Sequence, residues 1–277
     1  VNATSSPLFV YGDTSQYGAR YNGQSGVASS RGIAFDYAGN DVIDARNATN
    51  SVTIYSGTGN DTIYGSQEGD HLAGGSGNDD VHGQGGDDHI YGDSGINVDV
   101  NSRVITVVQT NASNLPDHDG LSAGSDTLFG NDDDDIIFGD HGRIDQTSDT
   151  LRILTSGNVT KIATVEPGNG AADTIYGNDG IDRILGGTQG DFIYGGNDGD
   201  IILGDHGVID YVFLDASVAT VDLVYTNSPD DGGGADTIQS NEGDDLVLGG
   251  AGNDDIQGNI DNDIIFGDHG RVTYNAG

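Results

Sequence analysis

The chain has 277 residues, of which 47 are glycine and none is cysteine, and its formal net charge at pH 7 is −36. Glu68, Glu166 and Glu242 are the only glutamates among the 45 acidic residues, and Lys161 is the only lysine. This composition disfavours helix, excludes disulfide and thiolate chemistry, and excludes nucleic acid and anionic membranes as partners. The excess aspartate needs external cations, and carboxylate oxygens are ligands that calcium prefers.

The N-terminal region at 1–35 lies outside any repeat, although "PLFVYG" and "RGIAFDY" are typical of strands. We expect this region to cap one end of the fold, and "YAGNDVIDA" from Tyr37 to be a degenerate first turn. The chain begins with Val1 and has no charged and apolar leader, which favours a processed or excised piece. No apolar run approaches the roughly 20 residues needed to cross a bilayer, so we expect no membrane insertion.

From Ser56 the chain divides into nonapeptides: "SGTGNDTIY", "GSQEGDHLA", "GGSGNDDVH" and "GQGGDDHIY". Each has aspartate at its sixth position and a large aliphatic residue at its eighth. The same frame resumes at Leu121, Gly168 and Asp231. Six residues of glycine and aspartate favour a tight turn, and the next three favour a short strand whose middle side chain points inward. Two nonapeptides then form one coil.

The eighth-position side chains are expected to form one inner column. Its members are Ile63, Leu72, Val81, Ile90, Leu128, Ile137, Ile175, Ile184, Ile193, Ile202, Ile238, Val247, Ile256 and Ile265. One aliphatic residue per nine makes a thin core, so burial alone does not offset the conformational entropy lost on ordering the glycine-rich turns.

The nonapeptide "GGSGNDDVH" at 74–82 and its counterpart "GGAGNDDIQ" at 249–257 match GGxGxDxUx, with U a large aliphatic, at every fixed position. The chain therefore resembles the repeats-in-toxin (RTX) family of large secreted bacterial proteins, whose repeats bind calcium. The resemblance implies an all-β, right-handed parallel β-roll (β-solenoid). "GNDDDDIIF" and "GNIDNDIIF" depart from it, because aspartate replaces the fourth glycine.

The resemblance also implies that the sixth-position aspartates and neighbouring backbone carbonyls enclose multiple Ca²⁺ ions. The implied ligands are Asp61, Asp70, Asp79, Asp88, Asp126, Asp135, Asp173, Asp182, Asp191, Asp200, Asp236, Asp245, Asp254 and Asp263. Calcium binding and folding should then be one event, and the calcium-free chain should be expanded.

Three segments rich in β-branched residues interrupt the repeats, and they predict β-hairpins. The hairpins are expected to start at Ile96, Thr150 and Val208, and their turns are expected at Asn101, Gly157–Asn158 and Asp215–Ala216. The expected divisions are a strand and cap region at 1–35, repeat blocks at 36–95, 121–142 and 168–207, hairpin insertions at 96–120, 143–167 and 208–230, and a fourth block with a C-terminal strand at 231–277.

Three blocks end in nearly the same decapeptide, "DIIFGDHGRI" at 135–144, "DIILGDHGVI" at 200–209 and "DIIFGDHGRV" at 263–272. "GDSGINVD" from Gly92 is a divergent first copy. In register, the aspartate of GDHG takes the second position of a turn. Two roles are open for this aspartate. It either closes the last calcium site of its block, where no further coil is expected to follow, or only forms the turn. The residues at this position are Asp140, Asp205 and Asp268. The adjacent histidines, His141, His206 and His269, should hydrogen-bond the departing chain.

The strand triplets around these copies have apolar side chains at their outward positions, where a solvated face would be polar. The residues are Ile136, Phe138, Ile201, Leu203, Leu246, Leu248, Ile264 and Phe266. Such a face must be covered. We expect each following hairpin to cover it, and the last copy, which has no such hairpin, to meet another molecule, by β-augmentation for example.

Other sites are less favoured by the sequence. His71 and His89 are expected one coil apart on an outward face, where a polar solvated surface is favoured over a transition-metal pair. Ice or carbohydrate binding requires an ordered threonine or aromatic row, which the tyrosines are too sparse to predict. No nucleophile or metalloprotease motif is present, so we expect no enzymatic activity.

These patterns predict a calcium-dependent extracellular structural module, either free after secretion or associated with a cell surface: a filament, surface-layer or adhesin subunit. Its expected partners are copies of itself or neighbouring repeats of a longer chain. The alternative is the calcium-triggered folding and secretion domain of a larger RTX exoenzyme or toxin.

Overall fold

The computed structural model describes residues 8–12, 39–99, 105–106, 122–147, 154–227 and 232–274. Most of the expected cap region at 1–35 lies outside these ranges, apart from β1 (Leu8–Tyr11), which is the strand expected at "PLFVYG". In the described ranges the elements are strands, except for one turn of 3₁₀-helix, η1 (Leu154–Ser156). No helix in this part of the chain is long and apolar enough to span a membrane.

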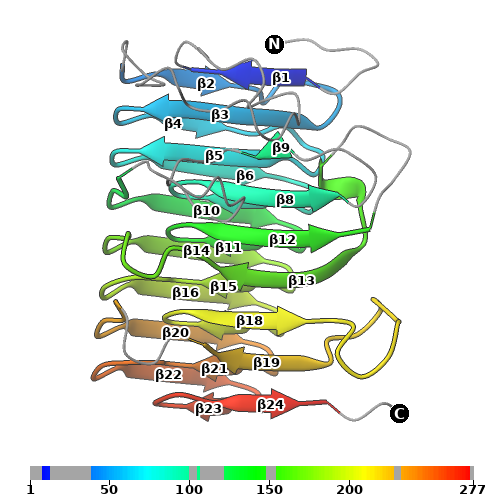
Figure 1. Ribbon diagram of the computed structural model, residues 1–277, viewed down its shortest axis with the longest axis vertical. Helices are drawn as coiled ribbons and strands as arrows, with labels where there is room; N and C mark the ends of the chain where they lie inside the picture. The colour runs from blue at the N-terminus through cyan, green and yellow to red at the C-terminus, as the bar shows by residue number, and fades with distance from the viewer. Residues whose placement is uncertain are drawn as a thin grey trace, which may run out of the picture.

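Two parallel sheets form the body of the molecule, and the chain passes from one to the other at each turn (Figure 1). Sheet A contains, in spatial order, β1, β3 (Val52–Thr58), β5 (His71–Ser76), β7 (His89–Tyr91), β11 (Ile136–Phe138), β15 (Arg183–Leu185), β17 (Ile201–Leu203), β21 (Leu246–Leu248) and β23 (Ile264–Phe266). Sheet B contains β2 (Val42–Asp44), β4 (Thr62–Tyr64), β6 (Asp80–Gln84), β10 (Thr127–Asp132), β14 (Thr174–Asp179), β16 (Phe192–Asn197), β20 (Thr237–Glu242) and β22 (Asp255–Ile260). The fold is an all-β parallel β-roll.

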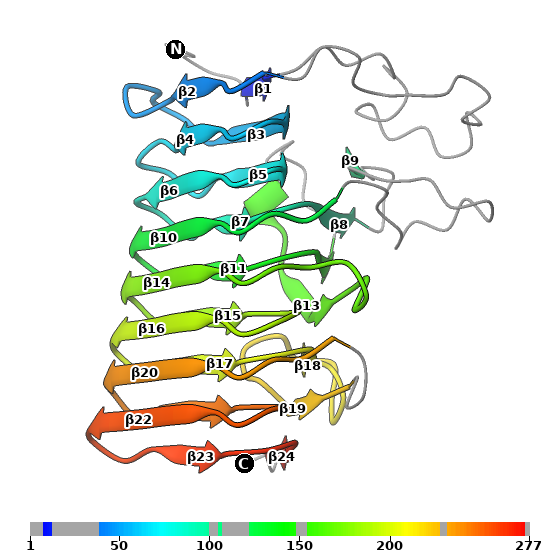
Figure 2. The same ribbon diagram turned by 90° about the vertical axis from the view of Figure 1, so that its left-hand side faces the viewer.

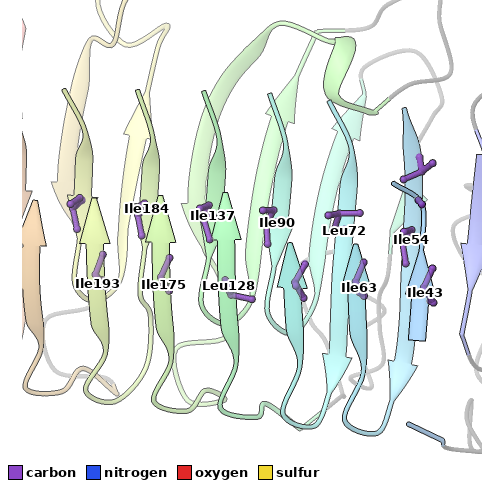
Figure 3. Close-up of a cluster of buried hydrophobic side chains, with 14 of the residues drawn as sticks. Ile43, Ile54, Ile63, Leu72, Ile90, Leu128, Ile137, Ile175, Ile184 and Ile193 are labelled. Atoms are coloured by element: carbon purple, nitrogen blue, oxygen red, sulfur yellow. The ribbon is translucent and has the colours of Figure 1, made fainter. Parts of the chain in front are cut away.

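The core lies between the two sheets and is the column of eighth-position side chains (Figure 3). Ile63 pairs with Val81 in sheet B, Leu72 pairs with Ile90 in sheet A, and all four are fully buried. Parallel pairing in constant register places an aliphatic side chain on the corresponding aliphatic side chain of the next coil. The column begins at Ile43, which confirms a first turn at "YAGNDVIDA".

The roll continues without a break across every insertion. Ile137 pairs with Ile90 before it and with Ile184 after it, although long insertions separate these strands in the chain. Gly139 begins a turn that Asp173 completes, since a Cβ added to Gly139 would lie 2.5 Å from the Oδ2 atom of Asp173. The expectation that no further coil follows GDHG is therefore wrong: each insertion leaves and re-enters the roll within a single turn.

The insertions form a third sheet, sheet C, on the outer side of sheet A (Figure 2). Only β12 and β8 are parallel neighbours in it; the other neighbours are antiparallel. Its spatial order is β24 (Arg271–Thr273), β19 (Leu223–Thr226), β18 (Gly207–Asp210), β13 (Val159–Thr164), β12 (Gly142–Gln146), β8 (Gly95–Asp99) and β9 (Ile105–Thr106).

One expected hairpin differs from the structure in its first strand. The segment from Thr150 was expected to supply both strands, but β13 pairs with β12, which begins at the last glycine of GDHG. Part of the expected first strand is the 3₁₀ turn η1. The turn residues Asp215 and Ala216 lie in the connection from β18 to β19, while Asn101 lies outside the described residues.

Sheet C covers the apolar outward side chains of sheet A. Phe138, Leu203 and Leu248 are fully buried, and they pack in one cluster with Ile144 and Ile162 of sheet C. Ile136, Ile201 and Leu246 belong to the same cluster and retain at most 8% exposure. In the last coil that the structure describes, Phe266 is partly buried against the cluster and Ile264 is 52% exposed.

The outer face of sheet B contains a row of stacked rings that the sequence did not predict. The row runs through Tyr64, His82, Phe129, Tyr176 and Tyr194, with ring centroids 4.4 to 4.9 Å apart. The residues are too far apart in the chain to show a row until the strand register is known. Because their flat faces pack against one another, the rings do not present a platform for stacking on a sugar.

Candidate calcium-binding turns

The turn preceding each strand triplet needs backbone conformations that few residues adopt. Gly77, at the fourth position of its turn, has φ +123°, in the left-handed region that favours glycine. Asp133, Asp198 and Asp261 occupy this position in three of the turns without the fourth glycine, and they adopt φ 77°, 69° and 79°. Aspartate tolerates this region better than most residues, so these three turns keep the left-handed conformation found at Gly77.

One carboxylate oxygen of each sixth-position aspartate holds neighbouring coils together. Oδ1 of Asp79 accepts the backbone N–H of Asp61 at 2.8 Å, and Oδ1 of Asp126 accepts that of Asp79 at 2.7 Å. A second series includes Asp88, whose Oδ1 accepts the N–H of Asp70 at 2.6 Å. The two series run along the roll to Asp254 and Asp263 respectively. Each aspartate therefore lies directly beside another, one strand spacing of roughly 4.8 Å away.

The other carboxylate oxygen is buried in most of these turns and has no hydrogen-bond partner among the described residues. This holds for Oδ2 of Asp79, Asp88, Asp126, Asp135, Asp173, Asp182, Asp191, Asp200, Asp236, Asp245 and Asp254. A buried acceptor without a partner is rare in native proteins, and a whole series of them in one register points to a missing ligand. Asp70 differs, because its Oδ2 accepts the backbone N–H of Ser66.

All of these oxygens except that of Asp245, whose turn begins with Ser240, face a space that only glycine leaves open. A Cβ added to Gly74 would collide with Oδ2 of Asp79 and with the carbonyl oxygen of Gly92 in the next coil. Gly130 lies in the same way between Asp135 and the carbonyl oxygen of Gly177. Carboxylate and carbonyl oxygens converging without a cationic side chain form a donor set that suits calcium. The residues present therefore fit the calcium ions that the repeat implies.

Burial of these carboxyl groups strongly favours their neutral form. It raises the pKa of Asp70 and Asp79 to about 7, of Asp182 and Asp236 to about 8, and of Asp200 to about 9. At neutral pH several of these groups keep a proton unless a cation replaces it. Calcium, when bound, supplies the positive charge that lets the carboxylates remain ionised in the roll, and its binding releases their protons.

The GDHG aspartates bind backbone amides with both oxygens. Oδ1 of Asp140 accepts the N–H of Ala171 at 2.8 Å, which pins the end of the insertion, and Oδ2 accepts the N–H of Thr188 in the next coil at 2.6 Å. Asp205 accepts the N–H groups of Gly234 and Ala251 in the same way. This geometry corresponds to turn formation rather than to an open calcium ligand.

Two further aspartates occupy the position that corresponds to Asp140 in the first and last copies of the GDHG motif. Asp93 was not among the predicted residues, yet its Oδ1 accepts the N–H of Gly124 at 3.0 Å and so closes the first insertion. Its signal was available, because "GDSG" is the divergent first copy of GDHG. Asp268, in contrast, is exposed on the last coil, where no described residue follows to supply the equivalent amides.

The GDHG histidines lie where the inserted chain returns. His141 is buried, with Nε2 2.9 Å from Nδ2 of Asn169, and its carbonyl accepts the N–H of Val165. Nε2 of His206 lies 3.2 Å from the hydroxyl of Thr188. His269 is exposed in the last coil that the structure describes.

His71 and His89 pair directly across β5 and β7, but they are buried rather than on a solvated face. Burial lowers the pKa of His71 well below its usual value and that of His89 to about 3, so both stay neutral. His71 lies between the rings of Tyr55 and Tyr91. In the part of the chain that the structure describes, no three His, Asp or Glu side chains gather as they would around a metal ion, so a calcium ion in the turns would take most of its ligands from backbone carbonyls.

Comparison with known families identifies the repeat. The family model for the RTX calcium-binding nonapeptide repeat matches residues 53–67, 64–99, 122–143, 167–205 and 230–265. These ranges cover just over half of the chain and include every sixth-position aspartate named above. Searches of curated proteins and of solved structures give no match. The chain belongs to the RTX family, and its repeats form a calcium-binding β-roll.

Proposed function

We propose that the protein is a secreted structural module that folds and associates with copies of itself when it binds several calcium ions. The observation that carries this proposal is the series of buried Oδ2 atoms without a partner among the described residues, which, except at Asp245, face a carbonyl oxygen of the next coil. Such a site forms only when two coils are already stacked. Calcium therefore links the stacking of coils to the neutralisation of the chain.

The charge balance supports the calcium dependence. A net charge of −36 opposes compaction, and the aspartates face one another at one-strand spacing. The chain has few cationic side chains to offset them, since lysine and arginine together number nine. A cation supplied from outside is needed, and millimolar extracellular calcium suits sites with affinities of about 10⁻⁴ to 10⁻³ M.

Calcium titration of the purified, decalcified chain tests the proposal. We expect circular dichroism to show β structure appearing with calcium, and light scattering with electron microscopy to show ordered polymers at higher protein concentration. A chain that keeps its full β structure in chelator would contradict the calcium-dependent folding. A chain that folds with calcium but stays monomeric at all concentrations would contradict the self-association.

The second candidate function is a calcium-triggered folding and export domain of a larger RTX enzyme or toxin. The thin core supports this second candidate as well as the first, because a chain that stays unfolded without calcium suits export before folding. Strict monomers after calcium-dependent folding would favour this candidate over the first.

A further inference from the structure

From Ser56 onward, the residue that follows a strand triplet of the roll is glycine at every described turn except two. The exceptions are Ser56, which starts a turn from sheet A to sheet B, and Ser240, which starts a turn from sheet B to sheet A. Both serines are fully buried. Their turns nevertheless contain the usual sixth-position aspartates, Asp61 and Asp245.

A glycine at this position leaves a small space between two oxygen atoms. At Gly195, one coil before Ser240, an added Cβ would collide with Oδ2 of Asp200 and would lie 2.6 Å from the carbonyl oxygen of Ser240. Oδ2 of Asp200 is buried and has no hydrogen-bond partner among the described residues. A calcium ion bound in this turn would join the carboxylate to the carbonyl oxygen.

The side chain of Ser240 occupies the corresponding space in the next coil. Its Oγ donates a hydrogen bond of 3.2 Å to the carbonyl oxygen of Gly258 on the neighbouring strand β22 (Figure 1). Burial raises the pKa of Asp245, and the hydroxyl of Ser240 opposes this rise, so the hydroxyl also interacts with the carboxyl group. One hydroxyl group thus interacts with both sides of the space that glycine leaves open elsewhere.

Ser56 makes the same contact in the other series of turns. Its Oγ donates to the carbonyl oxygen of Gly74, the first residue of the equivalent turn in the next coil. At Gly74 itself, an added Cβ would collide with Oδ2 of Asp79 and with the equivalent carbonyl oxygen, that of Gly92. Two serines in distant coils therefore bind the same carbonyl of the repeat, and the contact is a property of the position rather than of one turn.

A calcium ion and this serine hydroxyl exclude each other. The ion binds lone pairs of carbonyl and carboxylate oxygens, whereas the hydroxyl already donates its hydrogen to the carbonyl. The Cβ of serine also takes the space that glycine leaves open in neighbouring coils. The hydrogen bond joins two coils, as the ion would, but it adds no positive charge.

We infer that Ser56 and Ser240 replace a calcium ion in their turns, so that a serine hydroxyl closes these two positions of the roll and they bind no metal. The inference rests on calcium binding by the repeats and does not depend on the proposed self-association. The backbone carbonyl of Ser240 still faces Asp200, so the preceding site is unaffected. The chain therefore binds at least two ions fewer than one per sixth-position aspartate.

Counting bound ions tests the inference. Ser240→Gly should bind one calcium ion more per chain than the native protein, measured by atomic absorption after dialysis against saturating calcium in high salt, which screens the exposed aspartates. Ser240→Ala should gain no ion, because its Cβ still fills the space, and it should melt at a lower temperature, because the carbonyl of Gly258 loses its donor. Ser125→Gly, at an exposed serine in the turn of Asp126, is the matched control and should leave the count unchanged.

The reverse substitution provides a second test. Gly177→Ser places a hydroxyl where Oδ2 of Asp182 and the carbonyl oxygen of Gly195 enclose the space. This variant should bind one ion fewer than the native protein and keep its β structure in calcium, since the turn of Ser240 accommodates the same side chain. Ser56→Gly combined with Ser240→Gly should bind two more ions than the native protein, because the two turns belong to different coils.

Each other outcome separates this inference from the proposed function. An unchanged ion count in Ser240→Gly would overturn the inference, and a lower count would do so by showing that the hydroxyl is itself a calcium ligand. Neither result would alter calcium-dependent folding, which circular dichroism of the native chain reports. Conversely, a native chain that keeps its β structure in chelator would contradict the proposed folding, while a gain of one ion in Ser240→Gly would still establish the role of the serine.

Discussion

The role of an aspartate in this chain depends on its position in the nonapeptide. At the sixth position, Oδ1 binds the preceding coil and Oδ2 faces the carbonyl of the next, as in Asp79. At the second position of an interrupted turn, both oxygens bind backbone N–H groups, as in Asp140. The first arrangement leaves an acceptor for a cation, and the second does not.

The first residue-scale prediction concerns Asp200, whose pKa burial raises to about 9. Asp200→Asn keeps an acceptor for the N–H of Asp182, 2.9 Å away, but removes an ionisable group. Without calcium at pH 7 the variant should be more stable than the native chain by on the order of 2 kcal/mol. With calcium it should need more of the ion to fold.

Thermal unfolding followed by circular dichroism, with and without calcium, measures both effects. Asp198→Asn, at an exposed residue of the same turn, is the control for the change in net charge. A loss of stability in Asp200→Asn under both conditions would show that the carboxylate has only a structural role.

The second residue-scale prediction concerns the amide-binding aspartates. Asp140→Ala leaves the N–H groups of Ala171 and Thr188 without their charged acceptor, which should cost about 3 kcal/mol in saturating calcium. Hydrogen exchange should accelerate at these two amides. Asp268→Ala, in the exposed third copy, should change neither stability nor exchange, and an equal effect of the two substitutions would contradict the assignment.

At the scale of elements, each insertion is needed because sheet A has two apolar faces. One face forms the core with sheet B, and the other is covered by strands of sheet C. β24 follows the third GDHG and pairs with β19, as β18 pairs with β13 after the second. Strands of sheet C therefore lie beside sheet A as far as the last coil that the structure describes.

The packing of sheet C on sheet A predicts a large effect at Phe138, which is fully buried between them. Phe138→Ala should destabilise the calcium-bound protein by about 3–5 kcal/mol, because it removes a buried ring and leaves a cavity. Phe192→Ala, at a phenylalanine that is 50% exposed on sheet B, is the matched control and should cost far less. Urea unfolding in excess calcium compares them, and equal midpoints would mean that sheet C does not contribute to stability.

At the scale of the whole molecule, protons and calcium compete for the same carboxylates. The buried groups have folded-state pKa values near 7 to 9, as for Asp79, Asp182 and Asp200, against 3.8 for an ordinary aspartate. The calcium-free roll therefore binds more protons than the unfolded chain between about pH 4 and 9. Its stability is fully present below pH 3.8 and is lost as the pH rises through 7 to 9.

The corresponding prediction is that decalcified protein has most β structure near pH 4 and loses it by pH 9, and that calcium restores it at the higher pH. Circular dichroism of dialysed protein across this range measures the change. Repulsion among the ionised aspartates acts in the same direction. A calcium-free chain that gains β structure as the pH rises would contradict this account of the buried carboxylates.

The sequence by itself determined the repeating unit and the calcium chemistry. A period of nine with aspartate at the sixth position and an aliphatic residue at the eighth is a local pattern, and turn and strand preferences act over the same few residues. The coil, the inner column and the alignment of aspartates such as Asp126 and Asp173 follow from repeating that unit. The need to cover Phe138 also follows, because its outward position is fixed by the strand period of two.

Only the tertiary structure decided which distant segments become neighbours. The sequence could not show that Gly139 and Asp173 complete one turn across an insertion, that the insertions merge into one sheet, or that Phe129 joins a row of rings between His82 and Tyr176. The sequence also predicted a solvated face for His71 and His89, whereas both side chains are buried. These features depend on contacts between coils, whose register is set by the stacking of the whole roll and not by the residues along any one turn.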